Sequence, residues 1–570
     1  MSKFYYNQEQ DSYDAIVVGS GISGGWAAKE LCEAGLKTLV LERGRMVKHI
    51  EDYPTANMDD WDFPHNGQLP REEAAKQEKQ ARTGYTVRAQ HNFWFVNDLE
   101  HPYNETRRFD WMRGYHVGGR SIMWGRHSYR WSDIDFEANK REGIAVDWPV
   151  RYKDIAPWYD KVEAYIGVTG EKLGLPQLPD GVFEPMMELN CVEDHFRQKL
   201  AEQYEDRVVT AGRVAHINSD KQYEGRNRCQ FRNRCIRGCP FGAYFSSVSS
   251  TLPAAERTGN LTLRPDSIVH EITYDPDTKK ATGVKIIDRV TKEEFEFKAK
   301  VVFLCASAIA STSILMQSRS DRFPNGLGND SDQLGRNIMD HHLNVGASGK
   351  FDGFEDKYYK GRKPNGIYLP RFRNLGGGTN VDSFKRGYGY QGGASRGNWE
   401  DTIGELSHGK DLKEAILKPG GWTFGMGGFG EVLPYEDNRM TLDYDKLDQW
   451  GLPTVTFDAG YKENELNMRQ DMMEQAADML EKAGFREVTP FNGNSALGLG
   501  IHEMGTARMG RDRRTSVVNG YNQVHDCKNV YVTDGAFMTS ASCVNPSLTY
   551  MAFTARAADH AVKELKKGNI

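Results

Sequence analysis

Residues 14–44 read DAIVVGSGISGGWAAKELCEAGLKTLVLERG, and this stretch decides the fold. The apolar run Ala15–Val18 predicts a strand, residues from about Ser23 to Ala34 predict a helix, and Lys37–Leu41 predicts a second strand. A glycine-rich turn inside such a strand–helix–strand unit is typical of dinucleotide-binding domains. We therefore predict a Rossmann-like α/β domain at the start of the chain.

The glycines of this turn predict how a dinucleotide would be held. Gly19, Gly21 and Gly24 form the pattern GxGxxG, and Glu42 ends the second strand. We expect Gly19 to permit the tight turn, Gly21 to admit a pyrophosphate, and Gly24 to allow close helix–sheet packing. Backbone N–H groups at the helix start would bind the phosphates, and Glu42 would bind a ribose. The pattern alone does not distinguish FAD from NAD.

Size, charge and hydropathy limit the class of protein. The chain has 570 residues and a net charge of −6 with both signs interspersed, which predicts two large lobes and no nucleic-acid binding. No apolar run approaches the ~18 residues of a membrane span. Residues 1–10 are polar and predict no secretory signal. We expect a periplasmic protein co-exported with a signal-bearing partner, or alternatively a cytoplasmic one.

Three cysteines form a cluster in the middle of the chain. Cys229, Cys235 and Cys239 have the spacing C-x5-C-x3-C and lie among five arginines. Three thiolates suit an iron–sulfur cluster better than a closed zinc site, which requires four ligands. Zinc, a disulfide with a spare thiol, and reduced structural thiols remain alternatives. The other cysteines are expected to be buried core thiols, namely Cys32, Cys191, Cys305, Cys527 and Cys543.

The candidate catalytic groups lie near the C-terminus. His502 stands in the block GIHEMGTARMG, and a histidine suits the role of general base near neutral pH. A predicted strand ends in Asp534-Gly535. Asn545 and Pro546 then open a helix, which predicts Asn545 as its N-cap and Pro546 as its first residue. His341 and His342 are expected to pack or to join polar networks.

These motifs together resemble the glucose–methanol–choline oxidoreductase family over essentially the whole chain. The other matching pieces are Gly118-Gly119-Arg120-Ser121, Asp147-Trp148-Pro149, and Leu334-Gly335-Arg336-Asn337 with His341. The resemblance implies FAD as cofactor, with His502 and Asn545 over the flavin and Glu42 on the adenosine ribose. It also implies cofactor contacts from Gly118, Gly119, Ser121, Asp534, Gly535 and Pro546.

The resemblance also implies a domain order. A Rossmann-like FAD-binding domain would span residues 1–345, with a substrate lid at about 50–110 and an iron–sulfur loop at about 224–245. The Gly- and aromatic-rich residues 346–497 would form an α+β substrate domain on a mostly antiparallel sheet. Residues 498–570 would return to the FAD-binding domain.

Within the family, the cysteine spacing resembles the catalytic subunits of bacterial FAD/iron–sulfur sugar dehydrogenases. These include the glucoside 3-dehydrogenase, gluconate 2-dehydrogenase and glucose dehydrogenase types. This resemblance implies a 3Fe–4S cluster on Cys229, Cys235 and Cys239, a small accessory subunit, and a cytochrome or other electron acceptor. The catalytic blocks also resemble pyranose 2-oxidase, in which a histidine before a tryptophan attaches FAD. Here Met123 precedes Trp124, so we expect non-covalent FAD.

The function expected from this resemblance is oxidation of a secondary ring hydroxyl of a sugar or glycoside. C3 of a pyranoside is the first choice, and gluconate at C2 or glucose at C1 are the alternatives. An oxygen-using oxidase is a second class, which would need no cysteine relay. A lyase on this fold and an electron-transfer flavoprotein without substrate are further alternatives, and fold alone does not decide among them.

Overall fold

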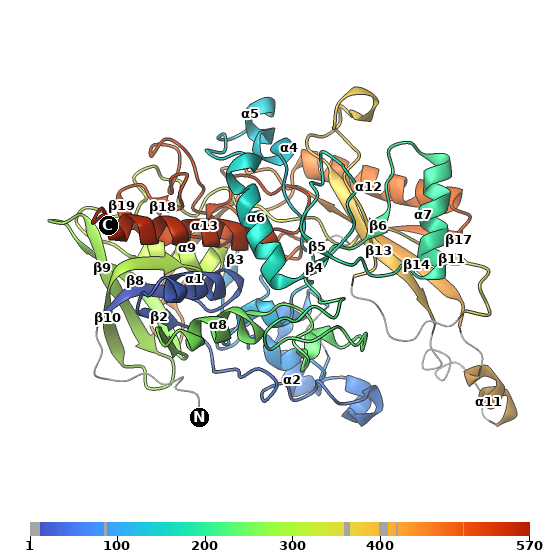
Figure 1. Ribbon diagram of the computed structural model, residues 1–570, viewed down its shortest axis with the longest axis horizontal. Helices are drawn as coiled ribbons and strands as arrows, with labels where there is room; N and C mark the ends of the chain where they lie inside the picture. Colours follow the sequence, from blue (N-terminus) through green and yellow to red (C-terminus); the bar gives the residue numbers. More distant parts are fainter. Residues whose placement is uncertain (1–11, 85–87, 358–364, 398–408, 418–419, 494) are drawn as a thin grey trace.

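The computed structural model describes residues 12–84, 88–357, 365–397, 409–417, 420–493 and 495–570. Two lobes lie side by side along the long axis of the molecule (Figure 1). The lobe on the left contains β1, β2, β8–β10 and helices α1 and α13. The lobe on the right contains β11, β13, β14 and β17 with helices α7 and α12.

An eight-stranded sheet in the order β18-β19-β10-β1-β2-β7 organises the first lobe. All neighbours from β19 to β7 are parallel, whereas β8 and β9 add an antiparallel branch beside β10. Its strands are β1 Ser12–Val18, β2 Thr38–Leu41, β7 Leu261–Arg264, β8 Ser267–Asp275, β9 Lys280–Asp288, β10 Glu294–Leu304, β18 Gln523–Val524 and β19 Cys527–Val532.

The predicted strand–helix–strand unit is confirmed as β1, α1 (Ile22–Glu33) and β2. Its central strand is buried on both faces, which explains the unbroken apolar run Ala15–Val18. Residues from the far end of the chain complete this lobe. Strand β19 pairs with β10, and α13 (Ser547–Lys566) packs against α1.

A six-stranded antiparallel sheet in the order β17-β11-β14-β13-β12-β6 organises the second lobe. This confirms the predicted α+β lobe on a mostly antiparallel sheet. Its strands are β6 Thr210–Ala211, β11 Val345–Phe351, β12 Ile367–Leu369, β13 Tyr388–Arg396, β14 Trp422–Gly430 and β17 Arg486–Asn492. Strand β6 and helix α7 (Cys191–Gln203) come from the chain before residue 345, so this lobe recruits part of the first expected segment.

Helix α12 (Glu463–Lys482) covers one face of the antiparallel sheet. Its stripe Met468, Met472, Ala476 and Met479 is fully buried against the sheet, as helical spacing requires. Gly484, with a φ of 84°, follows the helix and supplies the left-handed conformation that ends it. The opposite face of the sheet is not covered by α12.

Further elements surround the two large sheets; α6 packs on α13, α8 on α1 and α9 on β8. Residues 50–110, expected to be a loop-rich lid, contain α2 Arg71–Ala75, α3 Glu78–Ala81 and β3 Asn104–Glu105. The remaining elements are α4 Asp133–Phe136, α5 Ala138–Glu142, α6 Tyr152–Ile166, α8 Thr251–Arg257, α9 Ala308–Gln317, α11 Lys410–Ile416, β4 Val168–Thr169, β5 Phe183–Glu184, β15 Arg439–Leu447 and β16 Pro453–Asp458.

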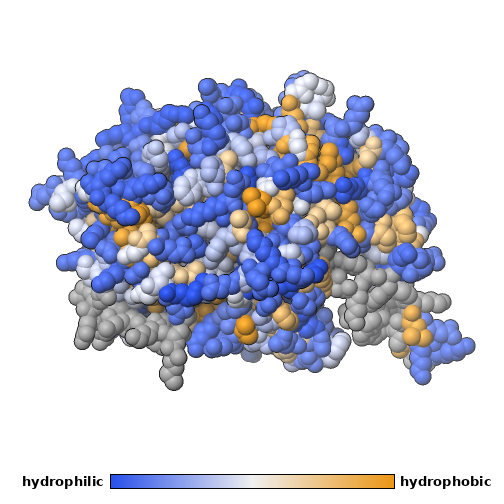
Figure 2. Space-filling model, in the orientation of Figure 1, coloured by the Kyte–Doolittle hydropathy of each residue, from blue (hydrophilic) through white to orange (hydrophobic). Residues whose placement is uncertain are grey.

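The surface is mainly hydrophilic on the face drawn in Figure 2, with scattered apolar patches. Among the helices of the described ranges, none combines the length and apolar character needed to cross a bilayer.

Candidate active site

A long cavity joins the GxGxxG turn to the predicted catalytic residues. Its walls include Gly19, Gly21, Glu42, His502 and Asn545. Gly119, Ser121, Asp534 and Gly535 line it as well. One cavity therefore contains most of the predicted cofactor-binding residues together with both predicted catalytic side chains.

The three glycines of the turn lie in three different environments. Gly19 has a φ of 94°, and a Cβ there would lie 2.6 Å from the carbonyl oxygen of Cys305. A Cβ on Gly24 would lie 1.9 Å from the Gly19 oxygen, so the helix could not pack this closely with any larger residue. A Cβ on Gly21 would meet no atom within 4 Å. Gly21 thus borders open space, where a pyrophosphate would fit.

Glu42 lies at the edge of this space, held by the neighbouring loop. Its carboxylate accepts hydrogen bonds from the backbone N–H of Ser20 at 3.1 Å, the Ser20 hydroxyl at 2.6 Å and the N–H of Gly44 at 3.0 Å. Burial raises the pKa of Glu42, and these bonds oppose that shift. The geometry suits a carboxylate that binds ribose hydroxyls.

The predicted Gly118-Gly119 motif closes the opposite side of the turn. Gly118 has a φ of 90° and donates its N–H to the Ser20 hydroxyl at 2.9 Å. A Cβ on Gly119 would lie 3.5 Å from the Cα of Gly21. The Ser121 hydroxyl donates to the Gly118 carbonyl at 2.5 Å and accepts the N–H of Ser247 at 3.1 Å, so it braces this turn.

Asp534 and Gly535 line the cavity between the glycine turn and His502. The Asp534 carboxylate accepts the N–H of Ala536 at 3.0 Å and the Ser311 hydroxyl at 2.5 Å, and burial raises its pKa to about 6. A Cβ on Gly535 would lie 2.2 Å from the Glu503 carbonyl oxygen. The Tyr550 hydroxyl borders the same cavity without a hydrogen-bond partner in the described protein. A bound group would supply that partner.

The protonation of His502 follows from its hydrogen bonds. His341 Nε2 lies 3.2 Å from the Ala541 carbonyl and 3.0 Å from the Ser542 carbonyl, so it must carry the proton and donate. Burial lowers the pKa of His341 to about 4, so the ring is neutral and its Nδ1 can only accept. His502 Nδ1 lies 2.8 Å from that atom and must donate. His502 Nε2 therefore carries no proton and can accept one.

His341 joins a polar network, as predicted, and is also the positioning residue for His502, a role that the sequence did not indicate. In the sequence, His341 stands out only because it follows the motif Leu334–Asn337. Its positioning role depends on contact with His502, which lies 161 positions further along the chain. Asp340 fixes the backbone of the same block by accepting N–H groups from Gly498, Gly500 and His502 at 2.8–3.0 Å.

Asn545 faces His502 and does not cap the helix. Its Nδ2 lies 3.4 Å from His502 Nε2, and its Oδ1 accepts a hydrogen bond from Gln391 Nε2 at 2.5 Å. Helix α13 begins at Ser547 with Pro546 as N-cap and no side-chain cap. The prediction that Asn545 caps this helix was wrong, because its amide is used by Gln391 and His502.

The lowered pKa of His502 predicts the pH at which kcat/KM falls on the acid side of its pH profile. Burial, and then the neighbouring His341 and Arg120, hold the pKa of His502 well below its usual 6.5. Protonation removes the base, so a lowered pKa moves the loss of activity to more acidic pH. We expect the acid limb of kcat/KM to lie below pH 6.5. A limb at or above 6.5 that disappears in His502→Gln would contradict this.

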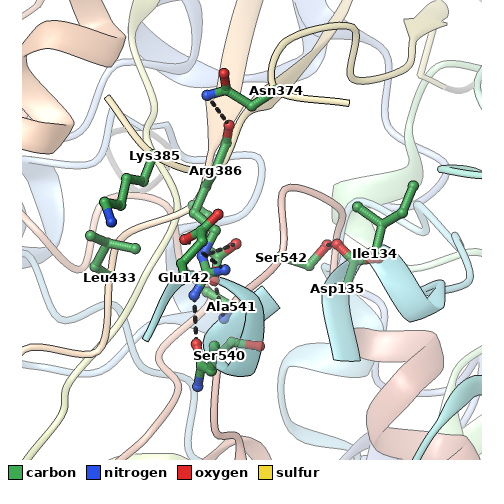
Figure 3. Close-up of polar contacts among 12 residues, drawn as sticks. Ile134, Asp135, Glu142, Asn374, Lys385, Arg386, Leu433, Ser540, Ala541 and Ser542 are labelled. Carbon is green, nitrogen blue, oxygen red and sulfur yellow. Dashed lines mark hydrogen bonds and ion pairs between the residues drawn. The ribbon is translucent and has the colours of Figure 1, made fainter. Parts of the chain in front are cut away.

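A buried arginine anchors, through Glu431, the loop that leads to Asn545 (Figure 3). Arg386 is 0% exposed, lies 3.0 Å from Glu142 and 3.5 Å from Glu431, and donates to Asn139 at 2.5 Å. Glu431 in turn accepts the N–H of Ala541 at 3.1 Å. The second lobe therefore anchors the backbone next to Ser542 and Asn545.

Replacing Arg386 with Met should destabilise the protein strongly, because Glu431, which is 2% exposed, would remain buried without a cation, and half-buried Glu142 would lose its partner. Breaking a buried ion pair on one side costs about 3–5 kcal/mol. The matched control is Arg322→Met, which removes the exposed Arg322–Asp330 pair and should cost about 0–1 kcal/mol. Thermal unfolding followed by circular dichroism would show a clearly larger drop for Arg386→Met. Equal melting temperatures for the two variants would refute the anchoring role.

The predicted metal ligands lie in one loop behind the cavity. Cys229 and Cys239 contact one apolar cluster, and Cys235 Sγ lies 3.9 Å from His216 Nε2. Burial raises the pKa of Cys229 to about 11, with the other two thiols adding to that shift. All eight cysteines are free thiols, which excludes the disulfide alternative in this structure. Within the described parts of the chain, no three His, Cys, Asp or Glu side chains converge as a metal site.

One tyrosine connects this loop to the cavity wall. The Tyr244 hydroxyl lies 3.1 Å from the Cys235 carbonyl and also hydrogen-bonds the Ile122 carbonyl. Ile122 directly follows Ser121, which lines the cavity. The loop arginines Arg234 and Arg237 pair with Asp59 and Asp60 of the N-terminal segment. Tyr244 therefore links the backbone at Cys235 to the segment next to Ser121 in the cavity wall.

Comparison with known proteins identifies the family. Residues 13–343 and 434–554 match the N-terminal and C-terminal parts of the GMC oxidoreductase family. The chain therefore belongs to the glucose–methanol–choline oxidoreductase family, whose members oxidise alcohol groups with FAD. Gly19, Gly21, Glu42 and Gly119 would hold the dinucleotide in the cavity described above.

The chain is 29% identical to 2-methyl-1,2-propanediol dehydrogenase of Mycolicibacterium austroafricanum, over 96% of this chain and 95% of that protein. It is 26% identical to the fructose dehydrogenase large subunit of Gluconobacter japonicus, over 99% and 100%. A formate oxidase variant of Aspergillus oryzae RIB40 matches with a TM-score of 0.62 at 15% identity, over 99% of this chain and 100% of that chain. The last similarity establishes the fold alone.

Proposed function

We propose that this protein is an FAD-dependent dehydrogenase that oxidises a secondary ring hydroxyl of a sugar or glycoside to a ketone. C3 of a pyranoside is the preferred position. The observation that carries the proposal is the unprotonated Nε2 of His502, which lies 3.4 Å from the Asn545 amide in the cavity that contains the glycine turn. FAD, when bound, would accept the hydride that leaves the alcohol carbon.

The side chains of this protein would handle the proton and the oxygen. His502 Nε2 would take the proton of the hydroxyl, and its Nδ1–H bond to His341 would stabilise the charge that develops on the ring. Asn545 Nδ2 would donate to the same substrate oxygen and hold it near His502. The similarity to a fructose dehydrogenase large subunit supports a sugar as the substrate. The similarity to a 2-methyl-1,2-propanediol dehydrogenase makes a smaller alcohol the alternative substrate.

We propose further that electrons leave through a 3Fe–4S cluster on Cys229, Cys235 and Cys239 to a partner. The spacing of the thiols and the link through Tyr244 from the Cys235 backbone to the cavity wall support this, although the described side chains do not converge as a metal site. The relative named as a large subunit supports a small accessory subunit. That subunit would carry an export signal to the periplasm, and a cytochrome would accept the electrons. An oxygen-using oxidase without a cluster is the alternative.

The direct test is product identification. The purified protein would be incubated with a panel of glycosides, glucose and gluconate, with a quinone or phenazine dye as acceptor, and the products identified by NMR. We expect a 3-keto glycoside. Formation of a lactone from glucose, or of a 2-keto acid from gluconate, would replace the C3 assignment with the corresponding alternative.

We predict that FAD is bound without a covalent link, because Met123, which lines the cavity, has no nucleophilic nitrogen. Acid precipitation should release all yellow colour into the supernatant. Mass spectrometry of the tryptic peptides gives an independent reading, and a flavinylated peptide would refute the prediction.

A further inference from the structure

The face of the antiparallel sheet opposite α12 lines a second cavity beside the active site. Along β11, β13 and β14, apolar side chains alternate with polar or absent ones, and the apolar set packs toward α12. The other set lines the groove, which we call the sheet groove. Its functional groups belong to Ser348, Asn365, Gln391, Ser395 and Thr423, with His127 at one end.

Glycines form the floor of the sheet groove. Gly425 is paired with Ser348 on one side and with Gly393 on the other, so three strands present almost no side chain in that row. A Cβ on Gly425 would find only the Ser348 Cβ within 4 Å, at 3.9 Å. The protein has room for a side chain at this position and lacks one, which leaves a flat surface suited to a ring.

The sheet groove opens onto the catalytic pair. Gln391 lines the groove and donates to Asn545 Oδ1, and Asn545 faces His502. His127 lines both the groove and the main cavity. From Gln391 to Ser395 the groove follows β13 for about 13 Å at the usual strand rise, which exceeds one pyranose ring.

The chemistry of the groove selects uncharged hydroxyl groups. Hydroxyls and amides donate and accept in every direction, as the vicinal hydroxyls of a sugar require. Among the described lining residues there is no Lys, Arg, Asp or Glu. Lys350 lies opposite the lining residue Thr423 in the strand register, but its ammonium is already paired with the Glu487 carboxylate at 2.6 Å. A carboxylate or phosphate would therefore lose its hydration without gaining a counter-charge.

We infer that the sheet groove is a subsite for a second, neutral sugar unit attached to the ring that is oxidised. The preferred substrate is then an uncharged disaccharide or longer glycoside, rather than a free monosaccharide or a sugar acid. The inference rests on the proposed function for its link to catalysis, whereas binding in the groove can be measured without it.

The test compares wild type with Gly425→Leu, whose side chain would fill the groove floor. Gly378→Leu is the matched control, because a Cβ there meets no atom within 4 Å and the position lies outside the groove. We expect wild type to favour a neutral glucose disaccharide over methyl glucoside by about tenfold in kcat/KM, the worth of one or two neutral hydrogen bonds. Gly425→Leu should abolish this preference while keeping activity on methyl glucoside, and Gly378→Leu should change neither.

Calorimetric titration of the holoenzyme separates this inference from the proposed function. The disaccharide should bind wild type about tenfold more tightly than methyl glucoside or the carboxylate form of the disaccharide, and Gly425→Leu should remove the difference. Binding without any oxidation would refute the proposed function and leave the subsite standing. A disaccharide that binds no better than methyl glucoside, or equal losses on both ligands in Gly425→Leu, would overturn the subsite.

Discussion

Replacing His502 with Ala should lower turnover by about 10²–10⁴-fold, the range for a lost general base, with FAD still bound. The proton acceptor is the unprotonated Nε2 of His502, which the His341 contact fixes 3.4 Å from the Asn545 amide. Asn545→Ala should have a smaller effect, because it removes a donor and leaves the base. The measurement is dye-linked turnover at saturating glycoside, with FAD content checked by absorption.

A histidine remote from the cavity provides the control for this change. His270, on β8, is part of the first lobe but not of the cavity, so His270→Ala should keep near-normal turnover. If His502→Ala also kept near-normal turnover, the proton would leave by another route and the assignment of the base would be wrong.

Replacing Cys229, Cys235 or Cys239 with Ser should abolish electron delivery to the natural partner, since a cluster needs thiolate ligands. Reduction of FAD by substrate should survive, because His502 acts before any relay. Small dyes that reach the flavin directly should therefore still turn over. The comparison is cytochrome-linked against dye-linked activity in each variant.

Cys191→Ser is the matched control, because Cys191 is a free thiol in the second lobe and lies outside the cysteine loop. It should leave both activities intact. Iron and sulfide analysis of protein purified without air gives the second reading. Absence of iron, or zinc in its place, would refute the relay and favour the oxidase alternative.

Local signals made the first lobe and its cofactor turn predictable. The strand, glycines, helix and second strand follow one another within residues 14–44, and each is determined by its own residues. The second lobe was predictable only in outline. Its sheet recruits β6 from far upstream, which no local pattern along 346–497 encodes.

The site residues that sequence reasoning missed act through distant contacts. Arg386 is one arginine in a glycine-rich segment, and only folding brings it to Glu142 and to the loop of Ala541. For Asn545 the local pattern was misleading. It resembles a helix start and predicted a cap, but the Asn545 side chain instead accepts a hydrogen bond from the distant Gln391. Local sequence patterns can therefore indicate candidate catalytic side chains, but the orientation of these side chains depends on contacts between the two lobes.

The central claim is that His502 takes the proton of a glycoside hydroxyl while the carbon that bears this hydroxyl loses its hydride, which FAD, when bound, would accept. The most direct measurement mixes the holoenzyme with a neutral glycoside under strict exclusion of oxygen and follows the visible absorption of FAD. The account predicts rapid bleaching with one keto glycoside formed per FAD, and bleaching slowed in His502→Ala. FAD that stays oxidised with every glycoside, or bleaching without a ketone, would contradict it.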